Sequence, residues 1–275
     1  MQARLDGADL TARLRRVRGG AQAIPPAIRT ENAAMNSPAS RFNADPITHH
    51  NEWTAELVSN QVIHGDCTRV LQRLPSNSVD LVMTDPPYFV RYRDRLGRTI
   101  ANDSDPASVL GAFVDIHRVL KPNTFCVSFY GWSRVGDFFR AWSEAGFRAV
   151  GHIVWHKRYA SRCGFLRAHH EQAYLLAKGS PEMPDDPIED VRPWEYTGNR
   201  MHPTEKAVSI LIPLIESFSR PNALVLDPFA GSGSTLVAAA LCGRKYVGIE
   251  LEKRYCRVAR SRLADVVIRQ EQQFR

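Results

Sequence analysis

The sequence predicts an α/β protein with one open, mostly parallel sheet that is covered by helices on both faces. From about residue 56 onward, short apolar runs alternate with longer amphipathic segments, which is typical of repeated strand–helix units. Two of the runs, 79–83 and 223–226, are almost continuously apolar, as expected of strands that helices bury from both sides. The 275 residues, 44% of them hydrophobic, are enough to bury one substantial core.

Seven strands and six helices follow from this alternation, because each expected strand is a short apolar run and each expected helix is a longer amphipathic segment. The strands are expected at 61–65, 79–84, 124–130, 149–156, 172–177, 223–226 and 245–249. The helices are expected at 68–74, 107–120, 133–145, 205–218, 234–242 and 253–269. The last helix has its apolar residues on one face, opposite several arginines, and is therefore expected to pack on the domain rather than to bind DNA.

The region 1–55 is expected to be a poorly ordered extension, because it shows little periodicity and many Ala, Pro, Asn and Arg residues. Only a short helix near 5–17 is expected there, and Met35 is an alternative start of the chain. The region 56–275 is expected to form the single folded domain. Ligands of open α/β sheets bind beyond the carboxyl ends of the strands, so the residues just after strands are the first candidates for a site.

Composition and charge narrow the class of protein. The formal net charge is +7 and the isoelectric point is about 9.3, which suits a polyanionic partner such as DNA without establishing one. No apolar run approaches the roughly 20 residues of a membrane helix, and the Arg-rich start lacks the apolar stretch of a secretory signal. The five scattered cysteines have no zinc-ligand spacing. We therefore expect a cytoplasmic protein with reduced thiols, no membrane partner and no metal.

The first strand end that carries chemistry is Asp85-Pro86-Pro87-Tyr88, directly after the apolar run 79–84. Two consecutive prolines remove two N–H donors and stiffen the backbone, which leaves carbonyl groups free to accept from a ligand. An amino group on a nucleobase is a poor nucleophile because its lone pair is delocalised into the ring. The Asp85 carboxylate and the Pro86 carbonyl could bind its two hydrogens, aim the lone pair at a methyl donor and stabilise the developing charge. Tyr88 could stack on a base that has left the duplex.

The second strand end is glycine-rich and runs from Asp227 to Thr235, at the start of a predicted helix. Gly231 and Gly233 allow close approach of the backbone to a ligand, and the following helix start favours an anionic group. The next predicted strand ends at Glu250, which could accept two ribose hydroxyls. Leu236 stands where a dinucleotide fingerprint needs Gly or Ala, and no Gly-Lys-Ser/Thr of a triphosphate loop is present. A methionine carboxylate together with an adenosine ribose fits what remains.

Together these motifs resemble the amino-methyltransferases that modify DNA. In that family the Asp-Pro-Pro-Tyr motif, here at 85–88, is catalytic, and the Phe-x-Gly-x-Gly motif, here at 229–233, binds S-adenosylmethionine. The catalytic motif comes first, which resembles the permuted β group. Further matches are His202-Pro203-Thr204-Glu205-Lys206, followed by Ala207 where the family usually has Pro, and the segments around Asp66, Lys157 and Glu171. The resemblance spans residues 60–268.

The resemblance implies a Rossmann-like, mostly parallel seven-stranded sheet in the circularly permuted methyltransferase order. It also implies an S-adenosylmethionine-dependent enzyme that methylates an exocyclic amino group in DNA, with adenine N6 favoured by Asp rather than Ser at position 85. The expected catalytic residues are Asp85, Pro86, Pro87 and Tyr88. The residues expected to bind the cofactor are Asp66, His202, Thr204, Lys206, Asp227, Phe229, Gly231, Gly233, Ser234, Thr235 and Glu250. Asp66 is equally well explained as the N-cap of the helix that follows it.

Two stretches outside the predicted strands and helices, 89–105 and 158–201, are expected to be the loops that recognise the target DNA. Their arginines could grip phosphates or read guanine. The residues expected to contact DNA are Arg91, Arg93, Arg95, Arg98, Lys157, Arg158 and Arg200. A solvated loop without such a role is the alternative for each of them.

Other functions remain open at this point. Cytosine N4 methylation uses the same chemistry. Enzymes that methylate RNA or protein glutamine usually place the glycine-rich motif first, which disfavours them, and a DNA-binding relative that has lost catalysis is disfavoured by the intact Asp85, Gly231, Gly233 and Glu250. The sequence also leaves open a homodimer and an accompanying restriction endonuclease.

Overall fold

The computed structural model describes residues 53–90, 97, 99, 103, 106–198, 201–202 and 205–273. The expected extension, up to residue 52, and its helix near 5–17 lie outside the described residues. The described part of the chain starts with a short helix, α2 (Ala55–Val58), whose N-cap Thr54 accepts a hydrogen bond from the backbone of Leu57. Among the described residues no helix is long and apolar enough to cross a membrane.

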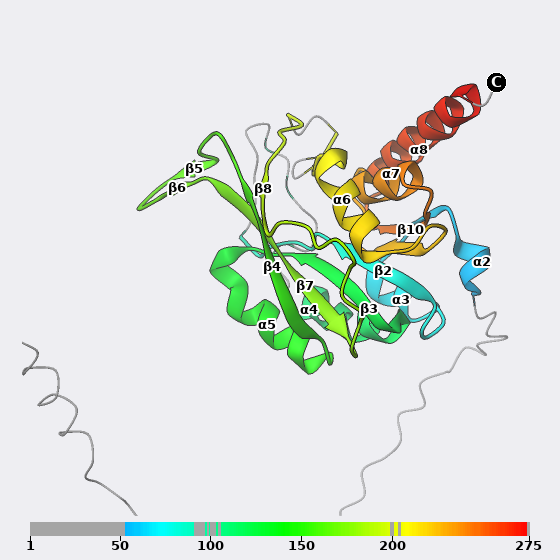
Figure 1. Ribbon diagram of the computed structural model, residues 1–275, viewed down its shortest axis with the longest axis horizontal. Coiled ribbons are helices and arrows are strands. Elements are labelled where there is room, and N and C mark those ends of the chain that lie inside the picture. Colours follow the sequence, from blue (N-terminus) through cyan, green and yellow to red (C-terminus); the bar gives the residue numbers. More distant parts are fainter. Residues whose placement is uncertain are drawn as a thin grey trace, which may run out of the picture. The chain divides into compact units, whose positions relative to one another are not determined.

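The core of the fold is an eight-stranded sheet (Figure 1). Its strands, in sheet order, are β1 (Gln61–His64), β10 (Lys245–Glu250), β9 (Leu224–Asp227), β2 (Val79–Thr84), β3 (Leu120–Phe129), β7 (His170–Lys178), β4 (Arg148–His156) and β8 (Val191–Pro193). All neighbours pair in parallel except β7, which runs antiparallel to both β3 and β4. A separate antiparallel hairpin consists of β5 (Arg162–Cys163) and β6 (Arg167–Ala168).

The predicted mostly parallel α/β sheet is confirmed, but the strand count is not. The eighth strand, β8, lies inside the stretch that was expected to be a loop, and it pairs with β4 at the sheet edge. It has only three residues and ends in Pro193. A strand this short, with a proline that cannot donate to a ladder, leaves no alternating pattern to detect and is tolerated only at an edge.

Helices cover both faces of the sheet, as the continuous apolar strands required (Figure 1). The first face carries α3 (Cys67–Leu71), α4 (Pro106–Val119) and α5 (Val135–Glu144), and a short 3₁₀ turn, η1 (Trp132–Arg134), precedes α5. The second face carries α6 (Val208–Phe218) and α7 (Ser234–Leu241), and α8 (Lys253–Gln273) packs beside α7 and β1. Along β2, Val82 points into the first core, whereas Leu81 and Met83 point into the second. The side chains of this one apolar strand therefore pack in both hydrophobic cores.

Strand register brings the residues of the predicted site to one edge of the sheet. Val82 lies beside Leu226 on β9, Asp227 lies beside Gly248 on β10, and Glu250 at the end of β10 lies beside His64. Because these strands are parallel, their carboxyl ends meet at the same edge. The segments after β1, β2, β9 and β10 therefore converge, although they come from distant parts of the chain.

The glycine-rich turn after β9 is held closely against α8. Gly233 has φ +81°, a left-handed conformation that side chains other than glycine rarely adopt, and a Cβ there would lie 2.7 Å from Cβ of Ala259. Both the backbone conformation and the packing therefore require glycine at this position.

We expect Gly233→Ala to lower the free energy of unfolding by about 2 kcal/mol or more, because it adds left-handed strain and an overlap with α8. Gly111→Ala is the matched control. Gly111 lies within α4, and a Cβ there meets nothing within 4 Å, so the same change should stabilise the protein by about 0.5–1 kcal/mol. Urea unfolding of both variants measures this, and equal effects would contradict the assignment.

Candidate active site

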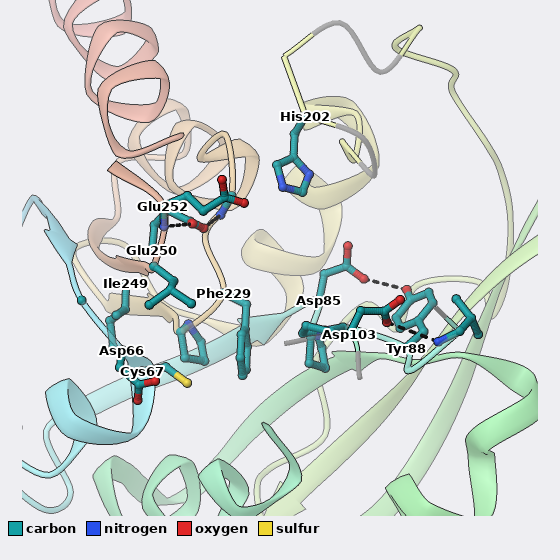
Figure 2. Close-up of a pocket in the computed structure, with 17 residues that line it drawn as sticks. Asp66, Cys67, Asp85, Tyr88, Asp103, His202, Phe229, Ile249, Glu250 and Glu252 are labelled. Carbon is teal, nitrogen blue, oxygen red and sulfur yellow. Dashed lines mark hydrogen bonds between the residues drawn. The ribbon is translucent and has the colours of Figure 1, made fainter. Parts of the chain in front are cut away.

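Asp85 follows β2 and is held by two side chains. Its Oδ1 accepts a hydrogen bond of 2.6 Å from the Tyr88 hydroxyl (Figure 2). Its Oδ2 is 2.5 Å from Nζ of Lys206, which lies just before α6. Burial and the nearby Asp85 charge raise the pKa of Tyr88 well above its ordinary value, so Tyr88 stays protonated and donates. The carboxylate is thus oriented from both sides.

Lys206 lies beside Asp85. It was expected to bind the cofactor, but its ammonium is buried against Asp85 and lies over the rings of Phe129, at 4.9 Å, and Tyr88, at 5.8 Å. Aromatic faces and a carboxylate together suit a buried cation. Its position therefore indicates that it orients Asp85.

A buried carboxylate binds the backbone just after the Asp85–Tyr88 motif. Oδ1 of Asp103, which is only 5% exposed, accepts from the backbone of Phe89 at 2.6 Å and Val90 at 3.3 Å. Phe89 has φ +60°, and the chain bends at residues 89–90. Asp103 lies in the expected recognition loop 89–105, and the sequence showed no sign of this structural role.

Glu250, at the end of β10, faces the same cavity from the other side (Figure 2). Its Oε2 accepts from the backbone N–H of Gly231 at 2.8 Å, and its Oε1 accepts from that of Glu252 at 2.6 Å. Burial raises the pKa of Glu250, and these backbone donors oppose part of the shift. The contact to Gly231 joins the glycine-rich turn directly to the acidic strand end.

Arg262 of α8 supports the glycine-rich turn from behind, a role that sequence reasoning missed. Its Nη1 donates to the carbonyl of Ser232 at 2.8 Å, and to the hydroxyls of Ser232 and Ser234 at 3.1 and 3.2 Å. The same nitrogen lies 3.5 Å from Oε1 of Glu205. One guanidinium thus ties together α8, the turn and the segment before α6. No local pattern could reveal this, because Arg262 is one of several arginines on that helix.

Two other predicted cofactor residues make structural contacts. Asp66 is the N-cap of α3 and accepts from the backbone of Thr68 and Arg69, although it also lines the cavity. Asp227 is 3% exposed, accepts from the backbone of Phe229 at 3.0 Å and bonds the Thr235 side chain. It stabilises the turn from within and is not among the residues that line the cavity.

One cavity gathers most of the predicted site. The predicted residues that line it are Asp66, Asp85, Pro86, Pro87, Tyr88, His202, Phe229, Gly231 and Glu250. The residues that line it but were not predicted are Gly65, Cys67, Val90, Asp103, Pro228, Ile249, Leu251 and Glu252. Gly233, Ser234 and Thr235 lie behind the turn, at the start of α7. Asp85 and Gly231 therefore share one cavity, whereas Gly233, which was also expected to bind the cofactor, is not among the residues that line it.

Five of the seven residues expected to contact DNA lie outside the described part of the chain. Arg91, Arg93, Arg95, Arg98 and Arg200 lie outside the described residues, as does Thr204 among the cofactor residues. Arg158 is exposed. Lys157 is only 3% exposed and pairs with Glu171, so its ammonium is not available to a phosphate at the surface. The expectation that Lys157 binds DNA is not supported by its burial.

Comparison with known proteins identifies the family to which this fold and cavity belong. The family model described as DNA methylase matches residues 79–261, which include both strand-end motifs. The chain belongs to the DNA methylase family. This DNA methylase is 54% identical over 207 residues to the methylase YubD of Escherichia coli (strain K12), a match that covers 75% of the chain and 91% of the relative. The resemblance inferred from the motifs is thus confirmed.

Two further relatives extend the comparison of this DNA methylase. The type II methyltransferase M.HinfI of Haemophilus influenzae is 25% identical over 252 residues, with 75% of this chain and 69% of the relative covered. The DNA modification methylase TTHA0409 of Thermus thermophilus, solved in complex with S-adenosyl-L-methionine, has a TM-score of 0.59 and 25% identity. That match covers 76% of this chain and 96% of the solved one.

The buried Asp227 predicts a pH-dependent stability of this DNA methylase. Burial raises its pKa from the ordinary 3.8 to about 7. The folded state then binds the proton more tightly than the unfolded state, so the stability present below about pH 4 falls as the pH rises towards 7. We expect Asp227→Asn, which is neutral and keeps an oxygen for the Phe229 N–H, to gain stability relative to the wild type over that range.

Urea unfolding at several pH values between 4 and 8 measures this difference. Asp265→Asn is the control, because Asp265 is exposed on α8 and its replacement should leave the pH dependence unchanged. If the free energy of unfolding depends on pH in the same way for Asp227→Asn and the wild type, Asp227 does not titrate in this range.

Proposed function

We propose that this DNA methylase transfers a methyl group from S-adenosylmethionine to the exocyclic N6 of adenine in DNA. The observation that carries the proposal is the oriented Asp85 carboxylate, which faces the cavity that also contains Glu250 and Gly231. The Asp at position 85, where Ser is the alternative, favours adenine over cytosine. The match to the family model described as DNA methylase supports DNA as the substrate.

The residues of the cavity suit S-adenosylmethionine. Each carboxylate oxygen of Glu250 accepts a hydrogen bond from one backbone N–H group. Each oxygen therefore keeps a further lone pair for a ribose hydroxyl. Phe229 and Ile249 offer apolar contact to an adenine ring. When bound, S-adenosylmethionine supplies a methyl group that is already activated on a sulfonium.

The residues of the chain then prepare the amino group of the base. The Asp85 carboxylate and the Pro86 carbonyl accept its two hydrogens, and stabilise the positive charge that develops on nitrogen. Tyr88 and Lys206 already occupy one lone pair on each Asp85 oxygen, yet a carboxylate has about four such positions, so the base can bind without breaking either contact. The departing proton passes to Asp85 or to water.

The proposed activity predicts methylated adenine in DNA treated with the protein. Incubation of plasmid DNA with S-adenosylmethionine, followed by nucleoside analysis, should yield N6-methyladenine from the wild type and none from Asp85→Ala. N4-methylcytosine as the product would replace the adenine assignment. Product from neither base, or unchanged product from Asp85→Ala, would overturn the proposed function.

The contact between Lys206 and Asp85 predicts that loss of the Lys206 ammonium lowers kcat without weakening cofactor binding. We expect Lys206→Met to lower kcat by roughly tenfold or more, because Asp85 loses the cation that orients it, and to change the affinity for S-adenosylmethionine by no more than about twofold. Lys121→Met is the control, since Lys121 forms a similar ion pair of 2.6 Å with Asp80. Asp80 lies near the amino end of β2, remote from the cavity.

Steady-state kinetics and calorimetric titration of the cofactor measure the two effects separately. A large loss of cofactor affinity with an unchanged kcat would instead support the cofactor role that the sequence suggested for Lys206.

A further inference from the structure

The β5–β6 hairpin carries an unusual tip. Its strands pair Arg162 with Ala168 and Cys163 with Arg167, which leaves residues 164–166 as the turn. Phe165 has a relative exposure of 109% and Leu166 of 84%, so neither packs against the described part of the domain. Exposed apolar residues are common singly, but two adjacent ones at the end of an arm indicate a contact that is made with something else.

The hairpin points from the same edge of the sheet as the active site. β7 runs antiparallel to both β3 and β4, and β3 is parallel to β2. β4 is therefore parallel to β2, and the arm that follows β4 leaves from the carboxyl edge, where Asp85 also lies. Figure 1 shows the hairpin extending away from the ends of β4 and β7.

The arm is anchored firmly at its base. The backbone N–H of Lys157 donates to His169 at 2.6 Å, and that of Ser161 donates to Ala168 at 2.9 Å, which continues the ladder between β4 and β7. The Lys157 side chain is buried and paired with Glu171. The arm can thus hold its tip in one place relative to the sheet.

Charge indicates DNA as the partner of the arm. Residues 157–169 contain no Asp or Glu. Lys157 is neutralised by Glu171, so Arg158 and Arg167 are left as cations among the described side chains of the arm. A basic stem suits the phosphate backbone, and an apolar tip suits the space between bases, where Phe and Leu wedges are known to open base steps.

We propose that the Phe165–Leu166 tip enters the base stack beside the target nucleotide and supports its extrusion from the duplex. The proposal rests on the proposed function, because it assumes that the target base leaves the duplex to reach Asp85. The tip would fill part of the space that unstacking opens, while the arginines of the stem bind the flanking phosphates. In this proposal the tip helps to open the duplex, and the stem contributes to the affinity for DNA.

The test compares two duplexes that carry the modified site, which is first mapped by sequencing DNA methylated by the wild type. In one duplex the target base is normally paired, and in the other it lies opposite an abasic site. We expect Phe165→Ala/Leu166→Ala to lower kcat/KM by roughly tenfold or more on the paired duplex and by less than about threefold on the other, because an unpaired base needs less help to leave the stack. With 2-aminopurine at the target position, the wild type should raise the fluorescence and the double variant should not.

Two control variants make the result specific. Met183→Ala removes another apolar side chain that is 89% exposed but lies outside the arm. This variant should leave kcat/KM unchanged on both duplexes. Arg167→Ala should weaken binding to both duplexes alike and reduce its salt dependence. Equal losses of the double variant on both duplexes, or no loss on the paired one, would overturn the wedge. Wild-type protein that methylates no DNA would instead show that the proposed function fails.

Discussion

The site depends on the parallel alignment of β1, β10, β9 and β2. Parallel strands place their carboxyl ends at one edge, and backbone hydrogen bonds fix the register to a single residue. A slip of one residue would turn the apolar residues of β2 toward the wrong layer, so the two cores on either side of the sheet maintain this register. The relative positions of Asp85 and Glu250 are therefore a consequence of burying the sheet from both faces.

The carboxylates of Asp85 and Asp227 have different surroundings. Asp85 is oriented by a phenol and an ammonium, each of which contacts one of its carboxylate oxygens. Asp227 is buried, and burial raises its pKa to about 7. Asp85 thus faces the cavity, whereas Asp227 stabilises the turn that contains the glycines.

The conformation of the glycine-rich turn also depends on elements that lie far away in the chain. Its glycines allow the left-handed backbone, but Glu250 on β10 and Arg262 on α8 hold it in place. Glu205, before α6, contacts the same guanidinium. The turn, the last helix and the segment that carries Lys206 therefore form one connected unit beside Asp85.

The sequence by itself determined the fold class, because continuous apolar strands can be buried only between two helical layers, and it determined the two strand-end motifs, because their residue types are local. It also located most of the cavity, including Asp85, Phe229, Gly231 and Glu250. Only the tertiary structure decided that Lys206 contacts Asp85, that Lys157 is buried against Glu171 and that Arg262 supports the turn. These contacts join side chains from separate elements, so their partners depend on packing and register, which no local pattern records. The edge strand β8 was missed for a related reason, since three residues pair only because β4 offers them an open edge.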